Sequence, residues 1–296
     1  MLARLLRRFL AVQLLLGGLL SWWISPHLGL SLVWAVLGVV LFPIALVTVI
    51  GFIAAVRSHV PGSNGLWWRA LMGENWAMLR LSLLEMPWTF HPPRVLPAIG
   101  PERLIPVVLV HGYVCNHRIF DRLTCDLRQA GHPVLAVDLE PVFASIDDYA
   151  PLVEAAVERL CRETGASQVA LVGHSMGGLV IRVWMRQLGS HRAARILTLG
   201  TPHGGTRADL YPFSPNSLQM VWESPWLKDL STSETSDGRA LMQIALSPQD
   251  AIVFPQREQI LPGVPVTVFE GLGHIELCFN RKVRDWVVAQ LALAQR

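Results

Sequence analysis

A long hydrophobic region without charged residues opens the chain. No Asp, Glu, Lys or Arg occurs over residues 9–56, and a turn at residues 25–30 divides this region into two apolar runs. The first run has a helical length of about 24 Å, and the second, residues 31–56, is long enough to cross a bilayer. The pattern predicts a transmembrane helical hairpin over residues 1–60.

A secretory signal peptide is the alternative for the first run. Signal peptides end in a cleavage site of small residues. Here Trp22 and Trp23 occupy that position, and tryptophan is typical of a membrane–water interface. The sequence therefore favours a retained helix.

Arginines flank the outer ends of the predicted hairpin, and its turn contains none. Three precede it and three follow it: Arg4, Arg7, Arg8, Arg57, Arg69 and Arg80. Positively charged flanks stay on the cytoplasmic side of a membrane, so both ends and the domain that follows are expected there.

Residues 61–101 form the next predicted unit. Within residues 66–88, apolar residues that include Trp67, Trp68 and Trp76 recur at helical spacing between charged ones. This pattern predicts an amphipathic helix at the membrane interface, with packing of the helix on the following domain as the alternative. Prolines then mark a linker that ends near residue 101.

Strand-like and helix-like segments alternate through residues 102–296. Predicted strands cover residues 105–110, 134–137, 168–172, 194–199, 241–246 and 264–270, and predicted helices cover residues 116–130, 147–163, 178–188 and 280–293. Apolar strands separated by amphipathic helices predict an α/β class with a mostly parallel sheet flanked by helices. On the third of these helices, Arg182 and Arg186 are expected to face solvent.

Ser175 lies on a sharp turn between a predicted strand and a predicted helix. Gly173 and Gly177 flank it within the sequence Gly-His-Ser-Met-Gly-Gly. A nucleophile held on such a turn needs small neighbours because the backbone is crowded there. The following helix directs its N-terminal amides towards the same point, where they could stabilise an oxyanion.

This motif resembles the nucleophile elbow of the α/β-hydrolase superfamily, in particular of bacterial triacylglycerol lipases and esterases. The resemblance covers about the last two thirds of the chain. It implies that the backbone amides of Tyr113 and Met176 form an oxyanion hole, and that His111 and His203 are structural. For a bacterial protein with this hairpin, the expected location is the inner membrane.

The remaining members of a triad are expected at the ends of the last two strands. Asp250 lies in a segment with the form of the family's acid loop, and His274 follows a flexible glycine turn after the final strand. The order Ser175, Asp250, His274 is the order expected for this fold. Four other acids compete with Asp250 but are interpreted as solvated charges: Asp229, Glu234, Asp237 and Glu258.

Residues 205–238 form a long insertion without a predicted strand. Insertions of this length are usually functional, so we predict a helical lid that presents apolar side chains to an acyl chain. The candidate substrate-binding residues are Tyr211, Phe213, Trp222 and Trp226. Packing of short helices on the core is the alternative.

The composition limits the classes of partner and cofactor that the protein is expected to bind. The chain is 52% hydrophobic and 16% charged, with a formal charge of +3 and no basic patch, so nucleic acid is not an expected partner. No metal or other cofactor is expected, because the acids near the histidine loop (Glu270, Glu276 and Asp285) are too few for a calcium site. The four cysteines lack a metal-binding spacing.

The predicted function is a membrane-anchored serine hydrolase that cleaves carboxylic esters of lipid-like substrates. Its partners would be the bilayer and the acyl-ester substrate. An acyltransferase or a thioesterase could use the same triad. A non-catalytic membrane interaction protein is a third possibility, although a complete set of triad residues argues against it.

Overall fold

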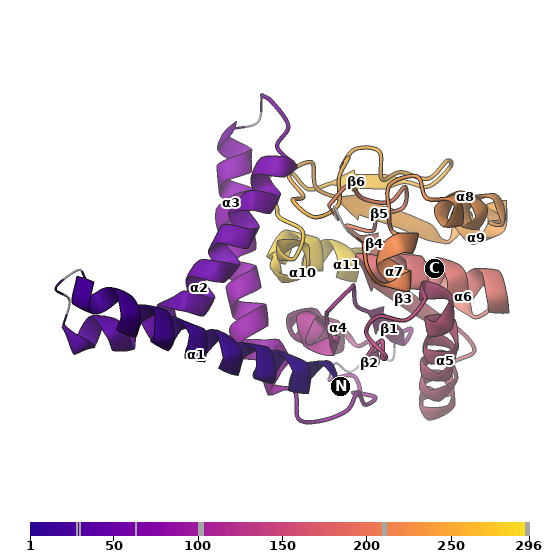
Figure 1. Ribbon diagram of the computed structural model, residues 1–296. Coiled ribbons are helices and arrows are strands. Elements are labelled where there is room, and N and C mark those ends of the chain that lie inside the picture. Colours follow the sequence, from indigo (N-terminus) through magenta and orange to yellow (C-terminus); the bar gives the residue numbers. More distant parts are fainter. Residues whose placement is uncertain (28, 30, 63, 100–103, 209–211, 294–296) are drawn as a thin grey trace.

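The computed structural model describes residues 1–27, 29, 31–62, 64–99, 104–208 and 212–293. A helical hairpin projects from an α/β domain (Figure 1). Its helices are α1 (Leu2–His27) and α2 (Leu32–Arg57). They approach closely at small residues, since a β-carbon added at Gly17 would lie 2.7 Å from Cβ of Phe42.

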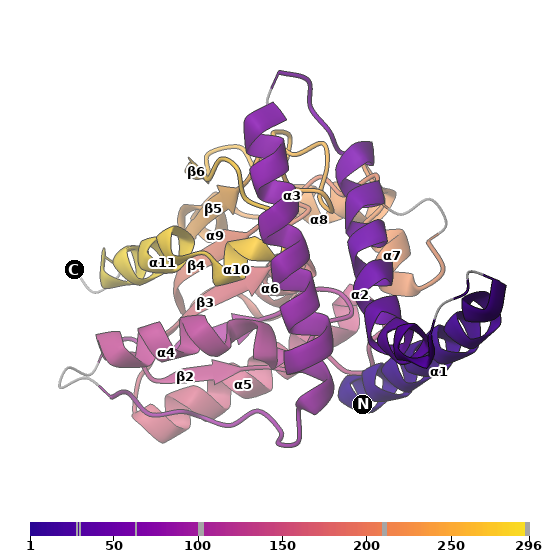
Figure 2. The ribbon, with the colours of Figure 1, turned by 90° about the vertical axis from the view of Figure 1, so that its left-hand side faces the viewer.

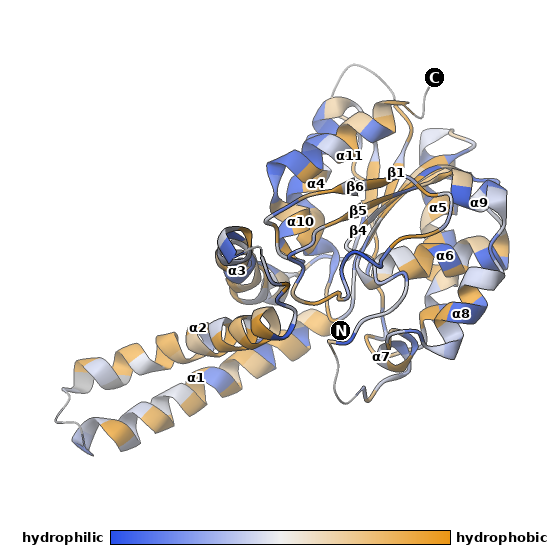
Figure 3. Cartoon of the chain, turned by 90° about the horizontal axis from the view of Figure 1, so that it is seen from above, coloured by the Kyte–Doolittle hydropathy of each residue, from blue (hydrophilic) through white to orange (hydrophobic). Residues whose placement is uncertain are grey.

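Hydrophobic residues make up most of both hairpin helices (Figure 3), and many of them are exposed. Both helices are apolar and long enough to span a membrane, and only 17% and 11% of their most apolar windows are buried. Helix α1 has 26 residues rather than the sixteen of the apolar run, because it includes the N-terminal arginines and continues through Pro26. Its 26 residues correspond to a length of about 39 Å.

Both outer ends of the hairpin contact the α/β domain. At the start of α1, the backbone amide of Leu2 donates a hydrogen bond of 2.9 Å to Oε1 of Glu140. At the end of α2, the Arg57 guanidinium donates to the carbonyl oxygens of Ala208 (2.8 Å) and Arg207 (3.1 Å). The two ends therefore lie on the same side of the hairpin.

Helix α3 (Asn64–Leu79) lies across the surface of the α/β domain (Figure 2). A π-helical segment (Arg80–Glu85) and a 3-10 turn (Met86–Trp88) continue it, so the predicted helix over residues 66–88 is present but changes its helical type. One face of α3 packs on the domain and on α2. The other face exposes Trp68, Met72 and Trp76.

Six parallel strands form one sheet in the order β2-β1-β3-β4-β5-β6. The strands are β1 (Val107–Val110), β2 (Val134–Ala136), β3 (Val169–His174), β4 (Ala193–Leu199), β5 (Met242–Leu246) and β6 (Val266–Val268). Side chains of β1 alternate between the two faces, with Val108 in one core cluster and Leu109 in the other. Both faces of strands β1 and β3 are buried, as their apolar sequences predict, whereas Val266 and Val268 of the edge strand β6 are exposed.

Helices cover both faces of the sheet. The core cluster on one face includes residues of α5 (Ala150–Thr164) and α6 (Met176–Leu188), and the cluster on the other includes residues of α4 (Asp121–Ala130), α10 (Glu276–Phe279) and α11 (Arg281–Leu293). The insertion holds α7 (Pro215–Gln219), α8 (Pro225–Thr232) and α9 (Ser236–Ala240). The α/β prediction with a parallel sheet is confirmed.

The two arginines of α6 correct the sequence interpretation. Arg182 is fully buried and forms an ion pair with Glu234, whose carboxylate also binds Arg239. Arg186 pairs with Asp147, and at 3.1 Å with Asp229. These side chains face the insertion rather than solvent, because α8 packs over this side of α6.

Candidate active site

Ser175 occupies a strained turn between β3 and α6. Its φ of 55° and ψ of −131° are rare for a residue with a side chain. A β-carbon added at Gly177 would overlap the carbonyl oxygen of Val110, and one at Gly173 would lie 2.6 Å from the backbone of Gly178. The glycines around Ser175 are therefore required by the packing of the turn, as the motif predicts.

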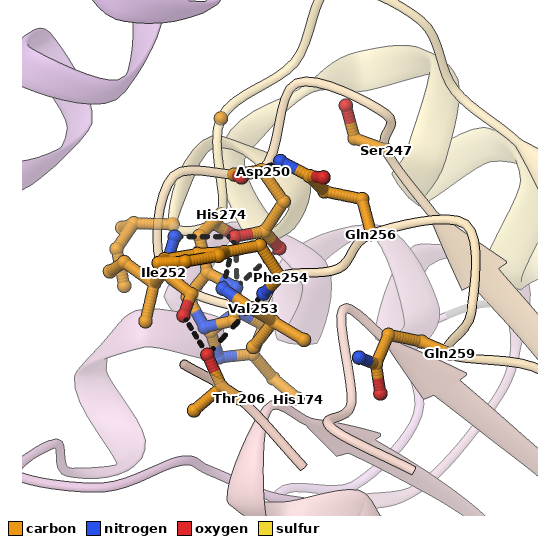
Figure 4. A network of polar contacts seen from close by, with 12 residues as sticks. His174, Thr206, Ser247, Asp250, Ile252, Val253, Phe254, Gln256, Gln259 and His274 are labelled. Atoms are coloured by element: carbon orange, nitrogen blue, oxygen red, sulfur yellow. Dashed lines mark hydrogen bonds and ion pairs between the residues drawn. The ribbon is translucent and has the colours of Figure 1, made fainter. Parts of the chain in front are cut away.

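Asp250 and His274 form a buried hydrogen-bonded pair (Figure 4). Nδ1 of His274 lies 2.6 Å from Oδ2 of Asp250, and each side chain is 3% exposed. The other carboxylate oxygen of Asp250 accepts hydrogen bonds from the backbone amides of Ile252 (2.8 Å) and Val253 (2.7 Å). These bonds fix the carboxylate and, through it, the orientation of the imidazole.

The surroundings of His274 favour its charged form. Burial opposes the charge, but the Asp250 carboxylate, through its charge and its hydrogen bond, and the charge of Glu74 raise the pKa of His274 above its ordinary value. A raised pKa strengthens the imidazole as a base. It also stabilises the imidazolium that forms when His274 accepts a proton.

The ends of five neighbouring strands bring these groups to one edge of the sheet. Ser175 follows β3, Asp250 lies beyond β5 and His274 lies beyond β6. Gly112, after β1, packs so closely on Ser175 that an added β-carbon would lie 3.2 Å from its Oγ. At Gly200, after β4, an added β-carbon would lie 3.2 Å from Nδ1 of His274 and 3.3 Å from Oδ2 of Asp250.

The backbone amides predicted for the oxyanion hole belong to segments that flank Ser175. Met176 directly follows Ser175. Tyr113 directly follows Gly112, which packs against Ser175. The Tyr113 hydroxyl lies 3.2 Å from Oγ of Ser214 in the insertion. Its ring packs edge-on against Phe143 at 5.9 Å between centroids.

Three other histidines lie near these segments in neutral form. Burial lowers the pKa of His111, whose Nε2 accepts the amide of Leu139 at 3.0 Å while its Nδ1 lies 2.8 Å from the carbonyl oxygen of Gly112. Burial and the charge of Arg182 hold the pKa of His203 well below its ordinary value. Nε2 of His203 lies 3.0 Å from Oγ1 of Thr198. The structural role of both histidines stays a prediction.

His174 is the third histidine, and the sequence interpretation gave it no role. It lies directly before Ser175, and its Nε2 lies 3.1 Å from the carbonyl oxygen of His274, with the two rings 4.7 Å apart. Burial and the charge of His274 hold its pKa well below its ordinary value, so it serves as a neutral donor. The sequence offered one indication that His174 lies near the site, namely its position inside the Gly-His-Ser-Met-Gly-Gly motif.

Contacts within the insertion differ among the predicted lid residues. Tyr211 lies outside the described residues. Phe213 is 73% exposed and stacks edge-on against Phe143 at 5.4 Å. Trp226 packs against the core and donates its indole N–H to Asp147 at 2.8 Å, which fits the core-packing alternative at that position.

Trp222 lies between the two extremes. It is partly exposed, its ring packs on Gly204, and the Arg207 guanidinium lies 5.4 Å from its centroid.

Among the described residues, no group of three or more His, Cys, Asp or Glu side chains could hold a metal ion.

Comparisons with known proteins agree with this architecture. The family model for the alpha/beta hydrolase fold matches residues 105–229. A segment of 110 residues is 33% identical to a triacylglycerol lipase of Pseudarthrobacter phenanthrenivorans, over 34% of each chain. The same identity and length hold for a triacylglycerol lipase of Burkholderia plantarii, over 34% of this chain and 30% of the relative. The match thus spans about a third of these curated relatives.

A solved structure shows similarity of fold over a larger part of the chain. The mature form of Bacillus licheniformis lipase BlEst2 superposes with a TM-score of 0.57 at 17% identity, over 68% of this chain and 99% of that chain. The region that matches the family model contains Ser175 and strands β1 to β4. The chain therefore has the α/β-hydrolase fold and is similar to lipases and esterases.

Proposed function

We propose that this protein is a membrane-anchored serine hydrolase that cleaves carboxylic esters of lipid-like substrates. The observation that carries the proposal is the buried Asp250–His274 pair at the sheet edge where Ser175 lies on its strained turn. A serine on such a turn, with an oriented histidine beside it, is the arrangement used for acyl transfer.

In the proposed reaction, His274 accepts the proton of Ser175 as Oγ attacks the ester carbonyl carbon. The tetrahedral oxyanion receives hydrogen bonds from the amides of Tyr113 and Met176. The imidazolium then protonates the departing alcohol, leaving an acyl-enzyme. Water, activated by His274, attacks this ester, releases the carboxylic acid and restores Ser175.

Two observations support a lipid-like substrate at a membrane. Tyr113, Phe143 and Phe213 form a chain of aromatic rings that starts beside the proposed oxyanion hole and ends at the exposed ring of Phe213. The hairpin exposes apolar side chains along two helices long enough to span a bilayer. Arginines at its outer ends favour a cytoplasmic catalytic domain, and the four unpaired cysteines suit a reducing compartment.

Hydrolysis of p-nitrophenyl esters by the detergent-solubilised protein tests this function. With esters from acetate to palmitate, we expect faster turnover of the longer chains. Ser175→Ala should lower kcat by about 10⁴-fold or more and abolish labelling by a fluorophosphonate probe. His274→Ala should be similarly severe, and Asp250→Asn somewhat milder.

His203→Ala is the matched control because His203 is a buried neutral histidine outside the proposed triad. It should reduce stability more than kcat. A folded Ser175→Ala variant that still hydrolysed esters, or a folded His203→Ala variant that did not, would contradict the assigned roles.

A further inference from the structure

The polar face of helix α3 touches the loop that carries His274. Glu74 is 5% exposed, and its Oε2 accepts hydrogen bonds from the backbone amides of Ile275 (2.8 Å) and Glu276 (3.1 Å). The other carboxylate oxygen lies 3.1 Å from the Ile275 amide. These two amides directly follow His274, although Glu74 lies 200 residues earlier in the chain.

Two glycines allow this approach. A β-carbon added at Gly273 would overlap the Glu74 carboxylate, and one added at Gly73 would overlap the carboxylate of Glu276. Helix α3 crosses α10 at this point (Figure 2). The absence of a side chain at each glycine leaves room for these two carboxylates between α3 and the histidine loop.

The same N-terminal region also contacts the loop that carries Asp250. Nε2 of Gln256 donates to the carbonyl oxygen of Asp250 at 2.8 Å and to that of Ser58, at the end of α2, at 3.0 Å. Arg69 of α3 donates to the carbonyl oxygen of Gly271 and lies 3.7 Å from Glu276. Both loops of the Asp–His pair therefore rest on the segment that links the hairpin to the α/β domain.

We propose that Glu74 is a positioning residue for the proposed ester hydrolysis: it holds the backbone behind His274 and adds a second carboxylate to its surroundings. The inference rests on the proposed function. It makes the membrane-proximal segment a part of the catalytic unit, since His274 is held from one side by Asp250 and from the other by α3.

The charged groups around Glu74 come from four elements. His274 and Glu276 belong to the histidine loop and α10, Asp250 to the acid loop, and Arg69 to α3 itself. Helix α2 contributes Gly51 and Ala55, which carry no charge. Burial raises the pKa of Glu74 to about 7, although the charge of His274 opposes this rise. Ionised Glu74 in turn favours the imidazolium form of His274.

Two substitutions separate positioning from simple structural support. Glu74→Ala removes both acceptors and should lower kcat by up to about 100-fold with little change in KM, because a small displacement of His274 suffices. Glu74→Gln keeps one amide acceptor and should restore most of kcat. Because Glu74→Gln removes the charge, it should also move the acidic limb of the kcat/KM profile to lower pH, by up to about one unit.

Glu85→Gln is the matched control, since Glu85 is also buried in the N-terminal segment but pairs with Arg80. It should leave the acidic limb in place. An NMR titration of the His274 ring, assigned with His274→Gln, gives a readout independent of activity. If the wild-type protein hydrolysed no ester, the proposed function would fail, while this titration would still decide the role of Glu74.

The inference is supported if Glu74→Gln lowers the pKa of His274 in that titration and Glu85→Gln does not. It is overturned if the His274 titration and the acidic limb of Glu74→Gln coincide with those of the wild type. A folded Glu74→Ala variant with wild-type kcat would overturn it as well.

Discussion

Helices α3 and α5 both lie at the surface of the α/β domain, but they differ in which face carries charged groups. Helix α5 has its charged residues outside, whereas α3 has a carboxylate inside and large apolar residues outside. Helix α5 buries apolar residues that include Val153, Val157 and Leu160, and it exposes charged residues such as Glu158. Helix α3 buries Glu74 and Asn75 beside Ala70, Leu71 and Ala77. Its outer face carries Trp68, Met72 and Trp76, which are 53%, 60% and 67% exposed.

The two outer faces are suited to different surroundings. The outer face of α5 is suited to water, as on most surface helices. The outer stripe of α3 repeats every four residues and is suited to a membrane interface, which Trp commonly occupies. Its inner face carries a carboxylate because it meets backbone amides of the histidine loop. We propose that α3 joins the bilayer to the active site, whereas α5 only supports the sheet.

The largest expected effect concerns the side of the membrane on which the domain lies, because α3 can rest on the bilayer beside the hairpin only if both ends of the hairpin lie on one side. A charge at mid-membrane costs about 2.5–3.5 kcal/mol, so the arginine-bearing ends should remain cytoplasmic. Green fluorescent protein fused after Arg296 should fluoresce, and alkaline phosphatase fused there should be inactive.

A fusion of alkaline phosphatase at Gly29, in the turn of the hairpin, supplies the matched control and should be active. The reverse pattern at the two sites would place the α/β domain outside. It would leave the assignment of Ser175 and His274 unaffected.

A smaller effect is expected at the outer face of α3. Replacing Trp68 and Trp76 by Ser should reduce hydrolysis of an ester embedded in vesicles by about 10-fold, because less apolar surface enters the interface. Hydrolysis of a soluble acetate ester should stay unchanged. The control is Leu152→Ser, since Leu152 is an exposed apolar residue on α5. Equal losses on both substrates would show that the tryptophans stabilise the fold instead.

The sequence predicted the parts of the fold that depend on local patterns. Strands appeared as short apolar runs, and the parallel sheet followed from their alternation with helices. Because parallel strands end at one edge, the residues after β3, β5 and β6 could be expected to lie together. The glycines beside Ser175 could be identified because crowding at a strand–helix turn is also a local property.

Contacts between distant charged residues could not be predicted in this way. Helical periodicity places a charge on the outer face by default, and this rule failed for Arg182, whose partner Glu234 comes from the insertion. It failed again for Glu74, whose partners follow His274. In both cases a buried charge is stabilised by a group far along the chain, and no spacing in the sequence indicates the pair.

The smallest expected effect concerns the pH dependence of stability. The comparison is between Glu74, on the inner face of α3, and His203, in the loop that follows β4. Buried Glu74 has a pKa of about 7, against 4.5 for an ordinary Glu, so between these values the folded protein binds a proton that the unfolded chain lacks. This group makes stability fall as pH rises from 5 to 7. His203 acts oppositely: its pKa is depressed, so the unfolded chain binds the extra proton below about pH 6.5.

Melting temperatures of the solubilised protein at pH 5 and pH 7 test these opposite signs. Relative to wild type, Glu74→Gln should increase the gain in Tm between pH 5 and pH 7, and His203→Gln should decrease it. Each change should be about 4–8 °C, since one proton over about one and a half pH units corresponds to about 2 kcal/mol. If Glu74→Gln reduced the gain instead, the carboxyl would be ionised throughout this range, and α3 would present a permanent charge to His274.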